Sequence, residues 1–327
     1  MTSISRPSLR ETAIFFSSGT IISKIRKELA FHVSFVIFWI SIDYMLKHDT
    51  RFDFYNLPAI EIALQQVAIL SIAISFIIQF RNNNAYQRFH EGREIWGGIV
   101  NDTRNFADLI QTNVRYVENS HYNENELKEF KAKLIYNVIT LVFLIKDHLR
   151  DEINETLDEL PYFQYLDLNV ISLEHKPNAV LMMLHKHLAE LQELRLVNDL
   201  NHYMLSTVIA RLTDRLGGCE RIKATPVPRV YTILTYRLIH VYLIWLSLGL
   251  IASNYLAALI VIPLAAYIFF GFAEIGTEIM NPFADSNFTF DLLGITHMID
   301  RNLSELVRMP LELPPIDDKP PVVKEFQ

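Results

Sequence analysis

Four long apolar stretches constrain this chain more than any other feature of its sequence. They cover residues 29–46, 62–80, 230–251 and 255–272, and the second and fourth contain no charged residue. A helix needs about 20 residues to cross about 30 Å of hydrocarbon, because each residue adds about 1.5 Å. Inside a bilayer the backbone must satisfy its own hydrogen bonds, so each stretch is predicted to be a transmembrane helix.

The alternative is a large soluble protein that buries the four helices in its core. Of the 327 residues, 50% are hydrophobic and 20% are charged, which a soluble protein of this size also reaches. The average composition therefore does not separate the two classes. Four separate runs of membrane-spanning length, two of them uncharged, favour the membrane protein.

Lys and Arg near the ends of the stretches predict how the helices are oriented. Basic residues precede the first stretch, follow the second and precede the third: Lys24, Arg26, Lys27, Arg81, Arg88, Arg93, Arg221, Lys223 and Arg229. Cytoplasmic flanks of transmembrane helices are rich in such residues. We therefore expect a multi-pass protein of the cell membrane, with two transmembrane hairpins and with both termini in the cytoplasm.

The chain between the two hairpins has a different character. It combines charged residues with apolar residues at helical spacing, and strand signals are scarce. We predict a cytosolic N-terminal segment (1–28), a first hairpin (29–80, with its second helix at 62–80), a cytosolic helical region (81–229), a second hairpin (230–272) and a cytosolic C-terminal segment with a tail (273–327). The predicted fold class is an all-α membrane protein with four transmembrane helices and a cytosolic helical bundle.

Patterns that carry catalysis or bind metals are sparse. Glu274 and Glu278 lie four residues apart, so on a helix they share a face and could hold a metal or serve a membrane-embedded enzyme. The more ordinary interpretation is a solvated or paired helix end. The single cysteine, Cys219, has no Cys or His at ligand spacing. We expect no enzyme and no cofactor, and the net charge of -7 argues against a nucleic-acid partner.

An apolar stripe runs along the second stretch. Ile72, Phe76 and Phe80 recur every four residues, so they lie on one face of the predicted helix over about 12 Å. Such a stripe is usually a packing face, but a hydrophobic ring can also gate a pore by dewetting. Polar amides flank the stripe on both sides, at Gln65, Gln66, Asn82, Asn83 and Asn84.

Three sequence blocks resemble the bestrophin family, and they occur in the family's order. The first is FRNNNAYQR at residues 80–88, which continues into EGREIWG at residues 91–97. The second is GGCERI at 217–222 with TPVP at 225–228, and the third is NPFAD at 281–285 with IDRNL at 299–303. The resemblance extends over roughly residues 5–305 of the chain.

This resemblance implies a homopentameric ion channel in which the second helices surround one central pore. It places a hydrophobic neck at Ile72, Phe76 and Phe80 and a cytosolic constriction at Leu200. The flanking amides would then lie at the entrances of the pore. The expected permeating ions are monovalent anions such as chloride, and the expected partners are membrane lipids and further copies of the chain.

Two alternatives remain open at this point. A monovalent-cation channel of the same fold is consistent with the acidic net charge, and a membrane-embedded enzyme would use Glu274 and Glu278. Animal bestrophins build a calcium clasp partly from an acidic cluster after the NPF motif. Here only Asp285 and Asp291 remain as acids in that segment. Because calcium needs six to eight oxygen ligands, we expect no strong calcium site and treat these two residues as weak candidates.

Overall fold

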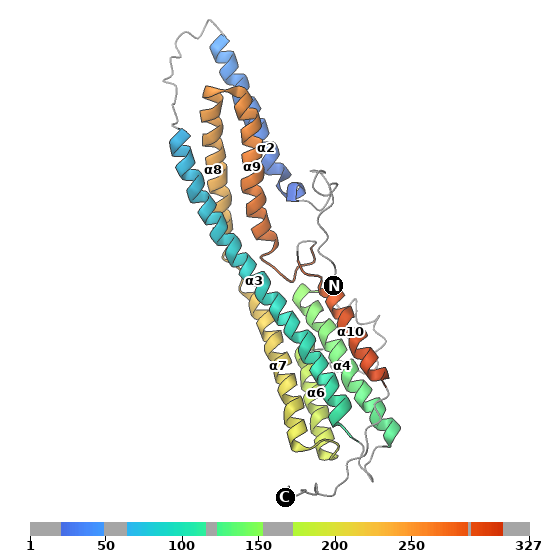
Figure 1. Cartoon of the computed structure of the whole chain (residues 1–327). Helices are drawn as coiled ribbons and strands as arrows, with labels where there is room; N and C mark the ends of the chain where they lie inside the picture. Colours follow the sequence, from blue (N-terminus) through green and yellow to red (C-terminus); the bar gives the residue numbers. More distant parts are fainter. Residues whose placement is uncertain (1–20, 49–63, 116–122, 153–172, 287–288, 310–327) are drawn as a thin grey trace, which may run out of the picture. The chain divides into compact units, whose positions relative to one another are not determined.

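The computed structural model describes residues 21–48, 64–115, 123–152, 173–286 and 289–309. Within these residues all regular structure is helical, which confirms the predicted all-α fold. The helices are α2 (Ile21–His48), α3 (Leu64–Asn113), α4 (Glu124–Arg150), α6 (Lys176–Glu193), α7 (Asp199–Ala224), α8 (Arg229–Ser253), α9 (Tyr255–Glu278) and α10 (Leu292–Arg308) (Figure 1).

The chain divides into two compact units. Unit 1 comprises Met1–His90, Pro226–Pro282 and Ser286–Thr289, and unit 2 comprises Glu91–Thr225, Phe283–Asp285 and Phe290–Gln327. Helix α3 contributes its first part to unit 1 and its second part to unit 2.

Unit 1 contains the apolar helices. Helix α2 packs against α8 and α9, which also pack against each other (Figure 1). The buried core is almost wholly aliphatic and includes Ile25, Val36, Val67, Ile74, Ile78, Ile239, Leu243, Ile262 and Phe270. Three segments among the described residues are long and apolar enough to cross a membrane: Ile21–Lys47, Arg229–Ser253 and Tyr255–Glu278. The remaining predicted stretch, 62–80, largely coincides with the start of α3.

A single asparagine makes the short turn between α8 and α9. Asn254 has an extended backbone, and its Oδ1 accepts hydrogen bonds from the backbone N–H groups of Leu256 (2.9 Å) and Ala257 (3.2 Å). The first N–H groups of a helix have no partner within the helix, and asparagine is among the best residues for satisfying them. This cap allows α9 to begin immediately after α8 ends.

Unit 2 is a helical bundle with α4 in its middle. Helix α4 packs against α6, α7 and α10, and every residue from 137 to 147 is buried. A helix that is covered on all sides is a central element rather than a surface one. Lys146 is buried within this stretch, and its Nζ lies 2.8 Å from carboxylate oxygens of both Asp147 and Glu152. The two partners compensate the cost of burying its charge.

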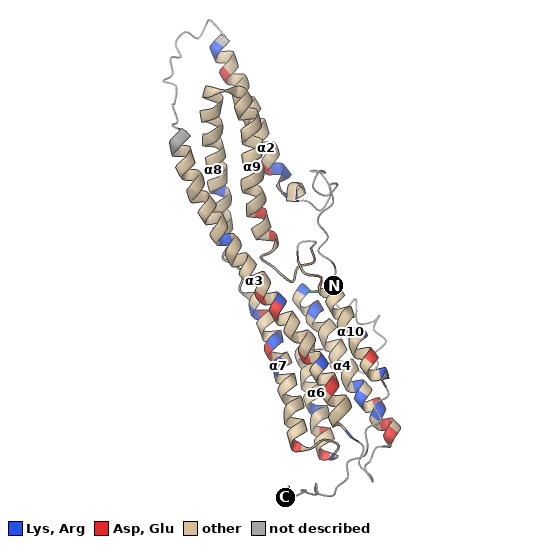
Figure 2. Cartoon of the chain, in the orientation of Figure 1, with Lys and Arg blue, Asp and Glu red and all other residues tan. Residues whose placement is uncertain are grey.

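The charged residues of the described chain are unevenly distributed between the helices. Helices α8 and α9 carry few of them, whereas α4, α7 and the second part of α3 carry many (Figure 2). The single cysteine, Cys219 of α7, is buried in unit 2. Burial raises the pKa of its thiol to about 12. The reactive thiolate is therefore scarce at neutral pH.

Candidate pore-lining face

The predicted stripe lies on the exposed face of α3 in the single chain. The side chains of Ile72, Phe76 and Phe80 are 58%, 72% and 65% exposed. On the opposite face of the same helix, Ile74 and Ile78 are buried in the core of unit 1. A spacing of four residues keeps a stripe on one face, so the two sets point in opposite directions from the helix axis. Three large apolar side chains in succession are thus free to contact something outside the chain.

Ile69 extends the same exposed face by one turn. Its side chain is 70% exposed, and it lies three residues before Ile72. The prediction from sequence did not include it, although its i, i+3 spacing to Ile72 was a signal for it. The stripe therefore has at least four large apolar members in the described part of α3.

Small hydroxyl residues on this helix satisfy their own hydrogen bonds. Ser71 Oγ donates to the carbonyl oxygen of Ala68 (2.7 Å), and Ser75 Oγ donates to that of Ser71 (2.8 Å). Such bonds to the preceding turn keep a hydroxyl group compatible with an apolar environment. The surface around the stripe is therefore less polar than its serine content suggests.

The C-terminal end of the predicted second span is hydrogen-bonded to α9. Arg81 is buried, and its guanidinium donates to the carbonyl oxygen of Ala273 (2.8 Å) and to Oγ1 of Thr277 (2.5 Å). Asn82 Nδ2 donates to the carbonyl oxygen of Phe272 (2.9 Å). These bonds fix the rotation of α3 about its axis, and so they fix which face carries the stripe.

A glycine allows this close approach. A Cβ atom added to Gly276 of α9 would collide with the side-chain oxygen of Asn82 and would lie 3.0 Å from its Cγ. Any larger side chain at this position would therefore push against the Asn82 side chain.

The predicted entrance amides differ in their positions. Asn82 points to α9, as described above, while Asn83 is exposed and Asn84 is partly exposed. The side chains of Gln65 and Gln66 lie outside the described residues.

Glu274 and Glu278, the candidate residues of a membrane-embedded enzyme, each contact another side chain of unit 1. Glu274 Oε2 accepts a hydrogen bond from the hydroxyl of Tyr236. Glu278 Oε1 forms an ion pair with Lys24 Nζ at 2.8 Å. The pair is thus built into contacts between α9 and its neighbours α8 and α2.

Leu200, the predicted constriction residue, lies in the first turn of α7 in unit 2. Its side chain is 67% exposed, and Tyr203 on the next turn is 69% exposed. The turn is fixed by Asn198, whose Oδ1 accepts a hydrogen bond from the N–H of Asn201 (2.8 Å). Leu200 therefore sits on a well-capped helix end with its side chain directed away from the bundle core.

The weak calcium candidates each have a partner in unit 2. Asp285 Oδ1 lies 3.2 Å from Nη1 of Arg150. Asp291 is the N-cap of α10, and its Oδ1 accepts a hydrogen bond from the N–H of Gly294 (2.8 Å). Both carboxylates are thus used in contacts within the fold.

Comparison with known proteins identifies relatives over most of the chain. Residues 1–305 match the model of the family described as bacterial/fungal bestrophin protein. The voltage-dependent anion channel-forming protein sll1024 of Synechocystis is 30% identical over 252 residues, which are 76% of this chain and 79% of that protein. The corresponding protein alr2987 of Nostoc is 32% identical over 245 residues, 74% of this chain and 76% of that protein.

Solved structures show the same fold. A bacterial bestrophin homolog from Klebsiella pneumoniae matches with a TM-score of 0.74 and 22% sequence identity, over 88% of this chain and 100% of that one. At this level of identity the likeness shows the fold alone.

Proposed function

The chain belongs to the bestrophin family of bacteria and fungi, and on that premise we propose that it is a subunit of an anion channel in the cell membrane. The relatives in Synechocystis and Nostoc are named as voltage-dependent anion channel-forming proteins. The chain is accordingly a channel subunit and not an enzyme.

The observation that carries this proposal is the exposed apolar stripe on α3. Three large side chains, more than half exposed, lie opposite a face that is buried in the core of unit 1. In a homopentamer whose α3 helices surround one axis, this stripe becomes a hydrophobic neck at Ile72, Phe76 and Phe80. A neck of this kind controls conduction by the ease with which water enters it.

The chemistry of the neck favours anions over small cations. The neck contains no fixed charge that could replace the water around an ion. An ion that passes through it must therefore lose part of its hydration shell without compensation. The rings of Phe76 and Phe80 have positively polarised edges and negatively polarised faces. Rings that turn their edges toward the axis stabilise an anion. Finer selection falls to the entrances, among them the exposed Asn83, and to Leu200 as a second, cytosolic constriction.

The other exposed apolar side chains of unit 1 suit contact with lipid. They lie on α2, α8 and α9 and include Phe31, Ile37, Phe38, Val241, Leu256, Ile260 and Leu264. With the basic flanks on the cytoplasmic side, the protein spans the membrane several times and has both termini in the cytoplasm.

A cation channel of the same fold is the second candidate, because the chain has a net charge of -7. The deciding measurement is the reversal potential of the purified protein in a planar bilayer under a potassium chloride gradient. A reversal potential close to the chloride equilibrium potential supports the proposal. A reversal potential close to the potassium equilibrium potential is consistent with the proposed fold and neck but shows a channel that selects cations. Absence of current from a purified, homogeneous oligomer would contradict the proposed channel activity.

A further inference from the structure

Three side chains of metal-binding type meet in unit 2, each from a different part of the bundle. His148 lies in the last turn of α4, His175 is the N-cap of α6, and Glu220 lies on α7. The Oε1 atom of Glu220 lies 2.9 Å from Nε2 of His148 and 2.7 Å from Nε2 of His175. Within the described residues these three form a group whose ligand atoms all lie within 4.8 Å of one another.

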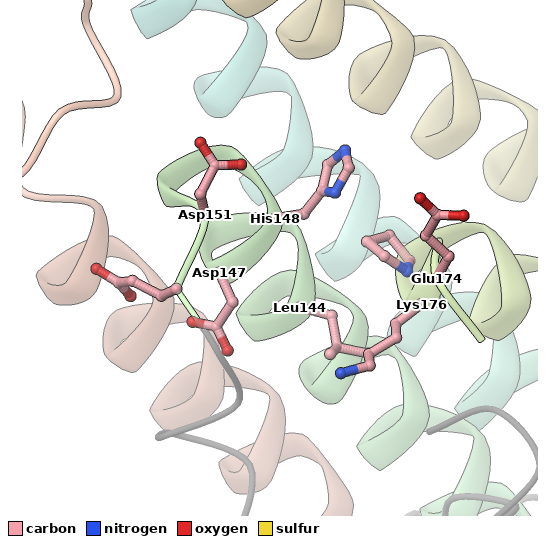
Figure 3. Close-up of a pocket in the computed structure, with 8 residues that line it drawn as sticks. Leu144, Asp147, His148, Asp151, Glu174 and Lys176 are labelled. Atoms are coloured by element: carbon pink, nitrogen blue, oxygen red, sulfur yellow. The ribbon is translucent and has the colours of Figure 1, made fainter. Parts of the chain in front are cut away.

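The triad is accessible to solvent. The side chains of His148, His175 and Glu220 are 30%, 42% and 35% exposed, so an ion can reach them from solvent. His148 also lines a pocket whose other charged residues include Asp147, Asp151, Glu174 and Lys176 (Figure 3).

We propose that His148, His175 and Glu220 bind a divalent transition-metal ion, and that zinc is the ion their chemistry fits best. Two imidazole nitrogens and one carboxylate oxygen form a donor set that zinc accepts, with water as a fourth ligand. Calcium and magnesium prefer sites made of oxygen alone. Cys219, the neighbour of Glu220, is buried and is not part of the group.

The present distances from Glu220 Oε1 to the two imidazole nitrogens are those of hydrogen bonds. Binding of a zinc ion requires these atoms to move slightly apart. Ligand atoms about 2.0–2.1 Å from a tetrahedral zinc ion are about 3.3 Å apart. Oε1 of Glu220 must therefore move about half an ångström away from each of the two imidazole nitrogens that it now contacts. Because all three side chains are partly exposed, this movement does not disturb the buried core of unit 2.

The proton of the His175 imidazole must also be rearranged. Nδ1 of His175 accepts a hydrogen bond from the N–H of Asn178 (3.3 Å), so the neutral ring carries its proton on Nε2 and donates it to Glu220. Coordination through Nε2 moves this proton to Nδ1 and gives up the long hydrogen bond to Asn178.

A bound ion would join three helices that are distant in sequence. It would link the last turn of α4, the start of α6 and the C-terminal part of α7. It would stabilise the folded unit by an amount that rises with the logarithm of the ratio of free zinc concentration to Kd. This inference rests on unit 2 and is independent of the proposed channel activity.

The test is a zinc titration of the full-length chain, purified in detergent without a histidine tag, by isothermal titration calorimetry. We expect one zinc ion per chain and a rise in the thermal unfolding midpoint. Glu220→Gln retains the shape of the side chain and a hydrogen-bond acceptor, but it removes the charged ligand. It should weaken binding at least about tenfold, as should His148→Ala. His185→Gln, an exposed histidine of α6 outside the triad, is the matched control and should bind as the unmodified chain does.

Two results would overturn the proposal. One is a folded, unmodified chain that binds no zinc at micromolar concentration. The other is a Glu220→Gln chain that is correctly folded by circular dichroism and binds zinc as tightly as the unmodified chain. Either result leaves the triad as a hydrogen-bonded contact between helices, and neither affects the test of channel activity by reversal potential.

Discussion

Gly276 determines how closely α9 can approach α3 at the end of the stripe. We expect Gly276→Ala to lower the free energy of unfolding by about 1 kcal/mol. The new methyl group would displace the Asn82 side chain and break its hydrogen bond to the carbonyl oxygen of Phe272. The measurement is thermal unfolding of the purified protein in detergent.

Gly97 provides the control for this substitution, because a Cβ added there meets nothing within 4 Å. Gly97→Ala should stabilise the protein by up to about 1 kcal/mol, since alanine is the better helix former. Combining Gly276→Ala with Asn82→Ala should remove most of the steric cost. Equal effects of the two glycine substitutions would show that the close approach is unimportant.

Lys131 of α4 carries a pH-dependent cost of folding. Burial, with further contributions from Arg115 and Lys128, lowers its pKa to about 8 from the usual 10.5. Between these two pH values the unfolded chain binds more protons, so stability rises as the pH increases from about 8 to about 10.5. Below pH 8 both states are protonated, and the cost to the folded state is constant.

We therefore expect Lys131→Met to stabilise the protein at pH 7 by on the order of 1 kcal/mol, with the gain disappearing toward pH 10. Thermal unfolding midpoints between pH 7 and pH 10 would measure this difference. Lys186→Met on α6 is the control, because Lys186 is exposed and is not among the charges that lower the pKa of Lys131, so this variant should show no such trend. If the stability gained by Lys131→Met does not change with pH, the lowered pKa of Lys131 is not its cause.

At the scale of the helix, the stripe on α3 makes a prediction about conduction. Replacing Ile72 and Phe76 by alanine should widen and wet the neck and raise single-channel conductance by at least about twofold. The matched control is Ile37→Ala with Phe38→Ala on α2, which removes the same two side-chain types from another exposed face. An equal change in conductance in both double variants would show that the stripe does not line the pore.

The sequence predicts the helical elements of unit 1 well, because their residues are apolar over the full length of a span. The predicted stretches 230–251 and 255–272 correspond to α8 (Arg229–Ser253) and α9 (Tyr255–Glu278). The continuation of α3 through Arg81 and Asn82 to Asn113 could not be predicted in the same way. Charged and amide residues in succession resemble a helix end, and their partners on α9 are distant in sequence.

Periodicity along one helix could predict the stripe, since the spacing of its residues is local. It could not predict the triad of His148, His175 and Glu220. These residues have no motif spacing, and they meet only because α4, α6 and α7 pack together. The stripe, which local spacing predicts, and the triad, which depends on packing, lie in different units of the chain.

At the scale of the whole molecule, the exposed apolar surface of unit 1 makes a prediction about assembly. Side chains such as Ile69, Phe76 and Leu256 are at least 66% exposed in one chain, so we expect lipid and further copies of the chain to cover them. We expect native mass spectrometry in detergent to give five times the chain mass of 38.0 kDa. A species of one or two chains under the same conditions would contradict a homopentamer.

The buried position of Cys219 also makes the protein convenient for spectroscopy. It is the one cysteine of the chain, and its thiol is shielded by α7 and its neighbours and held in the protonated form. A maleimide dye or spin label applied to the native protein would therefore react with a cysteine introduced at an exposed site, such as Leu200, and leave Cys219 unmodified. Labels at one site per subunit could then report distances between subunits without prior removal of the natural cysteine.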